Sequence, residues 1–190
     1  MLQLREIEAN EYRKLYAHMK LDFPGNELPP YTVVMRSLHK KIYGAVFLEE
    51  NGEALGYAVV TAPDGIPFAL ISYLAISPER RGQGYGGELL GLLGRRFAGH
   101  ALVVEVESPA AAKSEGDRAL RERRIRFYQR AGFRAVPTER AVIFGVAMEI
   151  MVNTPEDVGS VRKLMRGLYR PSLPSERWLR FIDIKDRARD

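Results

Sequence analysis

The 190-residue sequence contains no cysteine and only three histidines. Without cysteine the chain can form no disulfide, no thiolate metal site and no cysteine nucleophile. The histidines, His18, His39 and His100, are scattered, and no pair has the spacing of metal ligands. We therefore predict a protein that holds no metal and uses no thiol of its own in catalysis.

Long apolar runs are also missing. No run is long enough to span a bilayer. The first residues, MLQLREIEANEYRK, interleave acidic residues with apolar ones and contain no hydrophobic stretch typical of a signal peptide. We expect no signal peptide, no membrane partner and a cytoplasmic location.

The composition is that of a globular protein, with 46% hydrophobic and 28% charged residues. The length suits one domain with a proper core and is short for two. A net charge of +5 suits an anionic partner, such as nucleic acid or a phosphorylated cofactor, although a solvated arginine-rich surface is the commoner cause. No nucleic-acid motif and no basic stripe with interleaved aromatics is present, so we expect no nucleic-acid partner.

The first half of the chain predicts an antiparallel arrangement. A strand is expected at residues 2–7, followed by a helix at 10–19 capped by Asn10 and a loop at 23–30. A second helix at 31–41 leads into a meander of strands at 43–49, 54–61 and 68–76. The Asn51-Gly52 pair between two β-rich runs is a strong hairpin signal.

The second half alternates helices and strands, which favours a parallel crossover and hence a mixed α/β sheet. We expect a helix at 84–97, a strand at 102–107, a helix at 120–131 ended by Gly132, and strands at 133–136 and 142–152. A capping box at Thr154 predicts a helix to Tyr169, followed by an amphipathic tail at 178–184. We assign residues 1–152 to one domain and 153–190 to a helical extension, packed on that domain or exchanged with a second copy.

A glycine-rich segment, RRGQGYGG at residues 80–87, lies between a predicted strand and a predicted helix. Glycines let successive backbone N–H groups converge on one point, and the positive end of a helix adds to their attraction for anions. Arg80 and Arg81 add charge beside them. The segment therefore indicates a pyrophosphate cradle rather than a glycine-rich turn without a ligand.

The same glycines also satisfy a dinucleotide fingerprint, through Gly82, Gly84 and Gly87, with Glu105 placed where a ribose-binding acid would follow. Three features argue against this interpretation. A Rossmann turn leaves its strand almost directly, whereas residues 77–81 intervene here. Pro78 and two arginines occupy that gap, and the preceding strands look antiparallel. We therefore favour another pyrophosphate ligand.

Residues 74–86, LAISPERRGQGYG, resemble motif A of the GNAT acetyltransferases. The core of that motif, Gln/Arg-x-x-Gly-x-Gly/Ala, is met by Arg81, Gly84 and Gly86. Residues 127–133, FYQRAGF, are similar to the tyrosine-bearing helix end of the family and its Gly-Phe entry into the next strand. The resemblance covers roughly residues 43–152. The first forty residues fit the variable acceptor side of the family, and the tail matches nothing.

This resemblance implies a GNAT fold, a twisted mixed sheet flanked by helices in which strands 68–76 and 102–107 splay apart. The pantetheine arm of acetyl-CoA is expected in that gap, paired with the backbone of Leu74, Ala75 and Ile76. The pyrophosphate is expected on Arg81, Gly82, Gln83, Gly84, Tyr85 and Gly86. A primary amine, unidentified by the sequence, would attack the thioester directly in a ternary complex, which makes the protein an N-acetyltransferase.

Tyr128 matches the general acid of the family, which reprotonates the departing CoA thiolate, and a phenol is protonated at neutral pH. A core aromatic is the structural alternative for this residue. Glu105 and Glu107 are the base candidates, because residues two apart in a strand share one face. We predict Glu105 as the base because it lies deeper in the strand, and Glu107 as a group that attracts a cationic acceptor. An equally open alternative is that Glu105 forms an ion pair with an arginine or binds substrate without proton transfer.

Residues 108–118 depart from the family pattern, because no asparagine aligns after the strand and extra residues intervene. We expect this insertion to form a lid or specificity loop near the acceptor. Arg123, Arg126 and Arg130 follow at helical spacing and favour a solvated stripe over a phosphate-binding face. A catalytically silent CoA-binding or sensing module is the alternative function, and a homodimer is left open.

Overall fold

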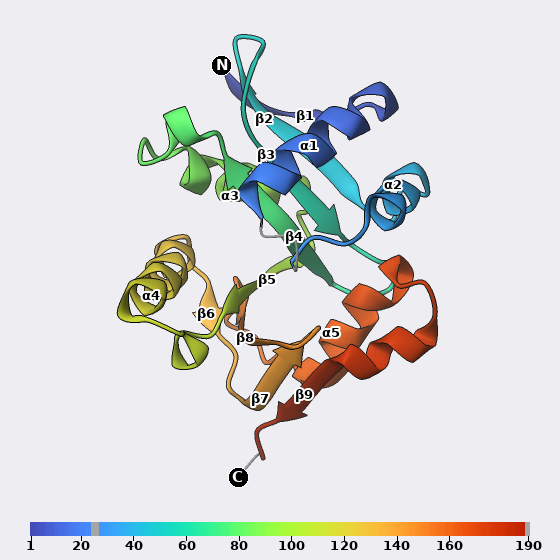
Figure 1. Cartoon of the computed structure of the whole chain (residues 1–190), viewed down its shortest axis with the longest axis vertical. Helices are drawn as coiled ribbons and strands as arrows, with labels where there is room; N and C mark the ends of the chain where they lie inside the picture. The colour runs from blue at the N-terminus through green and yellow to red at the C-terminus, as the bar shows by residue number, and fades with distance from the viewer. Residues whose placement is uncertain (24–26, 189–190) are drawn as a thin grey trace.

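The alternating patterns fold into a single mixed sheet with helices on both faces, as the computed structural model shows for residues 1–23 and 27–188 (Figure 1). The nine strands of these residues run in the order β1-β2-β3-β4-β5-β8-β7-β9, with β6 also paired to β8. Their bounds are β1 Leu2–Glu6, β2 Gly44–Glu50, β3 Glu53–Thr61, β4 Phe68–Ile76, β5 Ala101–Glu107, β6 Arg134–Ala135, β7 Thr138–Ile143, β8 Val146–Val152 and β9 Ile182–Asp186. The predicted mixed α/β fold is confirmed.

Apolar helix faces cover both sides of this sheet. The helices are α1 Tyr12–Asp22, α2 Tyr31–His39, α3 Tyr85–Arg96, α4 Glu115–Arg130 and α5 Val161–Tyr169. Buried residues of α1 and α2 pack on one face of β2 to β4, whereas α3 and α4 pack on the other face. Helix α5 lies opposite α3 and α4 and packs against β5 and β8. None of the described helices has the length and apolar character that crossing a membrane requires.

The first half follows the sequence closely. The predicted hairpin is present, and Asn51 and Gly52 both have positive φ angles, 51° and 83°. Helix α1 begins at Tyr12 rather than near Asn10, because Asn10 lies in a 3-10 turn, Ala9–Glu11, whose capping box is formed by Glu8 and Glu11. Part of the loop predicted at 23–30 lies outside the described residues.

The central strands β4 and β5 diverge, as the resemblance to the family implied. They pair in parallel only at their first positions, from Phe68 with Ala101 to Leu70 with Val103. The register between β3 and β4 shifts at the same point, and Ser72 is the extra residue of β4. A bulge of this kind bends its strand and increases the local twist. The bulge thus accompanies the opening of a gap between β4 and β5.

The insertion after β5 is more ordered than an open loop. Helix α4 begins at Glu115, capped by Ser114, whose side chain accepts a hydrogen bond from the Asp117 N–H at 3.1 Å. Pro109–Ala111 forms a 3-10 turn. The end of the predicted loop 108–118 is therefore the first turn of a helix.

One hairpin was not predicted. Residues 142–152, expected as a single strand, are divided between β7 and β8 by a turn at Phe144 and Gly145, with φ angles of 49° and 85°. A phenylalanine in the left-handed region gives no sequence signal for a turn. Tertiary contacts hold Phe144 there, because its N–H donates to the Phe181 carbonyl at 2.8 Å and its ring contacts Tyr169.

The C-terminal extension, residues 153–190, also differs from the prediction. The helix predicted to open at Thr154 begins instead at Val161, capped by Ser160, and Thr154 Oγ1 accepts from the Glu156 N–H in a local turn. The predicted amphipathic tail forms a 3-10 turn, Glu176–Phe181, and then strand β9, which pairs with β7. The extension therefore adds an edge strand and a helix to the sheet described above.

Candidate active site

The glycine-rich loop joins β4 to α3 with two residues in the left-handed region. Gly82 has φ of 76° and Gly84, the N-cap of α3, has φ of 91°. Residues with a Cβ adopt such angles at a cost, which explains the glycines. Residues 81–84 are exposed, and the first N–H groups of a helix have no partner within it. The loop thus presents backbone donors and a positive helix end to solvent, as an anion site requires.

Arg81 ties this loop to the rest of the fold. Its Nε donates to the Ile76 carbonyl at 2.9 Å, and its Nη2 contacts Asp22 Oδ1 at 2.8 Å. Asp22 also accepts from the Tyr57 hydroxyl at 3.0 Å. The Arg81 side chain remains 56% exposed, so a pyrophosphate on the loop could still approach its charge.

The edge of β4 beside the gap carries backbone groups that β5 does not use. The Ser77 N–H donates to Leu55 in β3, and neighbouring residues of a strand turn their backbone groups to opposite sides. Ala75 therefore faces β3, whereas Leu74 and Ile76 face the gap. Because Arg81 occupies the Ile76 carbonyl, the groups left for a ligand are the Ile76 N–H and both groups of Leu74.

Tyr128 lies near the end of α4, on the α3 side of the sheet. Its ring contacts Phe127 and Phe133 at centroid distances of 5.0 and 5.5 Å, and it packs on the core cluster that includes Ile76. Burial raises the pKa of Tyr128 to about 12, against a smaller lowering by the charge of Arg124. The phenol is therefore protonated at neutral pH and can donate.

Glu105 lies on the opposite face of β5. Its carboxylate Oε2 accepts a hydrogen bond from the Tyr169 hydroxyl of α5 at 2.7 Å. Its Oε1 is buried and has no hydrogen-bond partner among the described residues. Burial raises the pKa of Glu105 to about 7, although the hydrogen bond from Tyr169 lowers it. A carboxyl with such a pKa suits a general base near neutral pH.

Glu107 has a different environment, although it shares the face of Glu105. Its carboxylate contacts the guanidinium groups of Arg121 at 3.1 Å and Arg124 at 3.0 Å. Arg121 is buried and also donates to the Ser108 carbonyl. These contacts balance the charge of Glu107 and attach the end of β5 to α4. Its predicted role toward a cationic acceptor stays a prediction.

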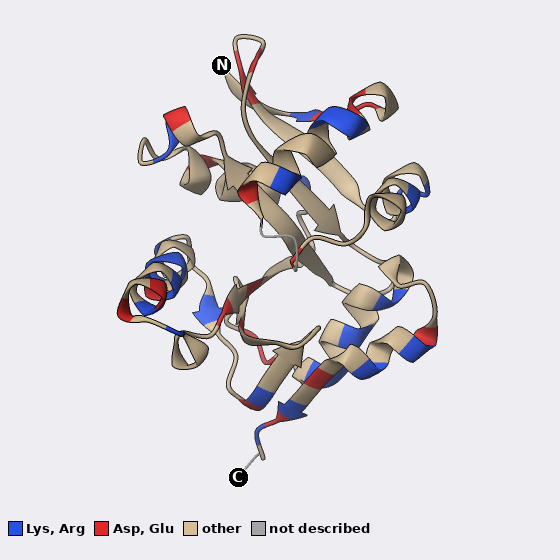
Figure 2. Cartoon of the chain, viewed as in Figure 1, with Lys and Arg blue, Asp and Glu red and all other residues tan. Residues whose placement is uncertain are grey.

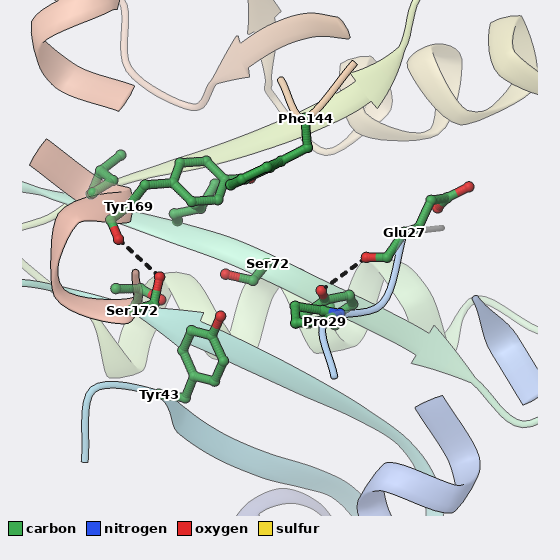
Figure 3. A pocket seen from close by; sticks show the side chains of 11 residues that line it. Glu27, Pro29, Tyr43, Ser72, Phe144, Tyr169 and Ser172 are labelled. Atoms are coloured by element: carbon green, nitrogen blue, oxygen red, sulfur yellow. Dashed lines mark hydrogen bonds between the residues drawn. The ribbon is translucent and has the colours of Figure 1, made fainter. Parts of the chain in front are cut away.

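A cavity of about 90 Å³ opens beside the bulge of β4 (Figure 3). Ser72 and Tyr73 contribute from β4, Phe144 from the turn before β8, and Tyr169 from the C-terminal extension. No motif pointed to Tyr169, because nothing in the extension resembles a known family. Its hydroxyl nevertheless joins the wall of this cavity to Glu105.

The charged surface is unevenly distributed. Figure 2 shows lysine and arginine on α4 and along the C-terminal extension. Arg123, Arg126 and Arg130 of α4 are exposed, as expected for a solvated stripe. Within the described ranges, no group of three or more histidine, aspartate or glutamate side chains is arranged to hold a metal ion.

Residues 43–135 match the model of an acetyltransferase (GNAT) domain. No curated protein matches the sequence. Among solved structures, a GNAT-family acetyltransferase from Bacteroides thetaiotaomicron has a TM-score of 0.74 at 20% identity, over 88% of this chain and 96% of that one. The ribosomal-protein-S18-alanine N-acetyltransferase of Escherichia coli gives 0.55 at 18% identity, over 85% and 98% of the two chains. The spermidine N-acetyltransferase of Vibrio cholerae, solved with CoA and spermine, gives 0.59 at 14% identity, over 80% and 94%. The family-model match identifies a GNAT acetyltransferase domain at residues 43–135 of this chain, and the solved structures share its fold.

Proposed function

We propose that this enzyme transfers an acetyl group from acetyl-CoA to a primary amine, by direct attack in a ternary complex. The observation that carries the proposal is the placement of Glu105 and Tyr128. One is a carboxyl whose Oε1 is buried and the other a partly buried phenol, and they lie on opposite faces of the sheet beside the strands that diverge. A thioester in the gap would have a base on one side and an acid on the other.

The residues along the gap fit acetyl-CoA. The backbone donors of Gly82, Gly84 and Gly86, with Arg81, would hold the pyrophosphate at the start of α3. The free edge of β4 at Leu74 and Ile76 would pair with the pantetheine arm as an added strand does. Bound acetyl-CoA supplies the reactive acyl group, and the protein supplies position and proton transfer.

In the proposed mechanism, Glu105 accepts a proton from the ammonium form of the acceptor. The free amine attacks the thioester carbon, and a backbone N–H of β4 stabilises the negative charge on the carbonyl oxygen. The C–S bond then breaks, and Tyr128 protonates the departing thiolate. The attacking nitrogen loses its second proton as the amide forms, and that proton restores the Tyr128 phenol. The cavity beside Ser72 is the acceptor site in this scheme, because Tyr169 in its wall contacts the base.

The alternative is a module that binds CoA without catalysis. A binding module has no need of a buried carboxyl, because burying an ionisable group costs free energy. Release of the CoA thiol, followed with acetyl-CoA and a panel of primary amines, tests the proposal, with mass spectrometry of the acetylated product. CoA binding without any acetylated amine would favour the sensing module.

Gly84→Val is expected to weaken CoA binding about 10-fold or more, because a Cβ at this position obstructs the approach of pyrophosphate to the backbone donors. Calorimetry with CoA measures the effect. Gly52→Val is the matched control, since Gly52 has a similar φ of 83° in a remote turn and no atom within 4 Å of an added Cβ. Unchanged CoA affinity in a folded Gly84→Val protein would show that the glycine-rich loop does not bind the cofactor.

A further inference from the structure

The walls of the cavity are largely uncharged. Its lining combines apolar and aromatic side chains with the hydroxyls of serine, threonine and tyrosine. Glu27 is the one charged residue among the described lining residues, and Figure 3 shows its carboxylate turned away from the others. Its backbone carbonyl accepts from the Tyr73 hydroxyl at 3.1 Å. The side-chain charge of Glu27 interacts instead with Glu107 and Arg124 near α4.

The base is reached from this cavity through a tyrosine. Glu105 is not part of the lining, whereas Tyr169 is, and the Tyr169 hydroxyl donates to Glu105 Oε2 at 2.7 Å. The other titratable groups that interact with Glu105 are Tyr43, which precedes β2, and Tyr73 of β4. Both are neutral phenols, so Glu105 is the acid–base group that the cavity reaches through Tyr169, whereas the Glu27 carboxylate points away from the other lining residues.

We propose that the acceptor is a small primary monoamine with an apolar body, and that Tyr169 relays its ammonium proton to Glu105. This inference rests on the proposed function. The cavity of about 90 Å³ is smaller than the roughly 150 Å³ that encloses benzene, which limits the hydrocarbon body to fewer carbon atoms than benzene has. A second ammonium on that body would lose its hydration without gaining a counter-charge from the described walls.

The relay conserves protons and charge. An ammonium N–H proton passes to the Tyr169 oxygen as the phenolic proton passes to Glu105 Oε2. The products are a neutral amine, with its lone pair free for attack, and a neutral carboxylic acid, while Tyr169 remains a phenol. Burial and the neighbouring Glu105 raise the pKa of Tyr169 well above its usual value, which disfavours a lasting phenolate.

The acceptor class is tested with butylamine and diaminobutane, which share a carbon chain and differ by one ammonium group. We expect kcat/KM for butylamine to exceed that for diaminobutane by about 10-fold or more, because an unpaired charge is costly in the cavity. Equal values, or a preference for the diamine, would overturn the neutral-acceptor assignment.

The relay is tested with Tyr169→Phe, which keeps the ring and removes the hydroxyl. We expect kcat/KM for butylamine to fall about 10- to 100-fold. The acidic limb of the pH–rate profile should also move to higher pH, because Glu105 loses the hydrogen bond that lowers its pKa. Tyr12→Phe on α1, remote from the cavity, is the control for the same chemical change. Thermal unfolding and CoA calorimetry establish that each variant is folded.

The outcomes separate this inference from the proposed function. A wild-type enzyme that binds CoA but acetylates no amine would defeat the proposed function. Acetylation of butylamine by wild type, with an unchanged pH-independent kcat/KM in folded Tyr169→Phe, would defeat the relay alone. A fall of about 10- to 100-fold in the pH-independent kcat/KM, with intact CoA affinity, supports the relay. A shifted limb without that fall would leave Tyr169 as a hydrogen-bond donor that only lowers the pKa of Glu105.

Discussion

Glu105→Gln is expected to lower kcat by about 100-fold or more, the lower range of what a positioned general base contributes. The amide retains the size of the side chain but cannot accept the ammonium proton. In wild type, activity should fall as the pH drops through about 7, where the carboxylate becomes protonated. Steady-state kinetics across this range should show that limb in wild type and its absence in the variant, with unchanged CoA affinity.

The same substitution has an expected effect on stability. The pKa of Glu105 is raised from 4.5 to about 7 in the folded protein, so the folded chain holds this proton more tightly than the unfolded chain does. The associated stability is fully present below pH 4.5 and is lost as the pH rises to about 7. A shift of this size corresponds to about 3 kcal/mol at most. Denaturant unfolding at several pH values should therefore show a loss in wild type that Glu105→Gln lacks.

Glu107→Gln is the matched comparison on the same strand. It removes the charge that pairs with Arg121 and Arg124, so we expect lower stability and an acidic limb at the wild-type position. If Glu105→Gln retained the acidic limb, Glu105 would not be the base, and its bond to Tyr169 would be structural. If only Glu107→Gln removed the limb, the assignment of the base would pass to Glu107.

Tyr128→Phe is expected to lower kcat by about 10- to 100-fold with little change in CoA affinity, as removal of a proton donor does. The phenol has a pKa of about 12, well above that of a thiol in water. The departing thiolate would lie in the same buried surroundings, which raise its proton affinity too. Donation from Tyr128 thus stabilises a leaving group that has no water around it.

Single-turnover kinetics measures this step without interference from product release, which can conceal a slower chemical step in kcat. Tyr31→Phe, at a residue that is 40% exposed on α2, is the control for loss of a tyrosine hydroxyl. A Tyr128→Phe enzyme with the wild-type single-turnover rate would leave Tyr128 as a core aromatic between Phe127 and Phe133.

The sequence by itself determined the features that depend on local backbone chemistry. Gly82 and Gly84 stand where φ is positive, and Asn51-Gly52 forms the predicted hairpin, because these residue types tolerate the left-handed region. Alternation along β5 also placed Glu105 and Glu107 on one face, since successive side chains of a strand point to opposite sides.

Only the tertiary structure decided which partners those side chains meet. Glu105 contacts Tyr169, 64 residues away in a segment whose helix start was predicted too early, and Glu107 contacts two arginines of α4. The turn at Phe144 was missed for a related reason, because distant aromatic residues rather than local preference hold it. Periodicity fixes the face on which a residue lies, but desolvation and hydrogen bonding depend on what packs against that face. Because of those contacts, Glu105 has a pKa of about 7, whereas Glu107 on the same strand is held in ion pairs.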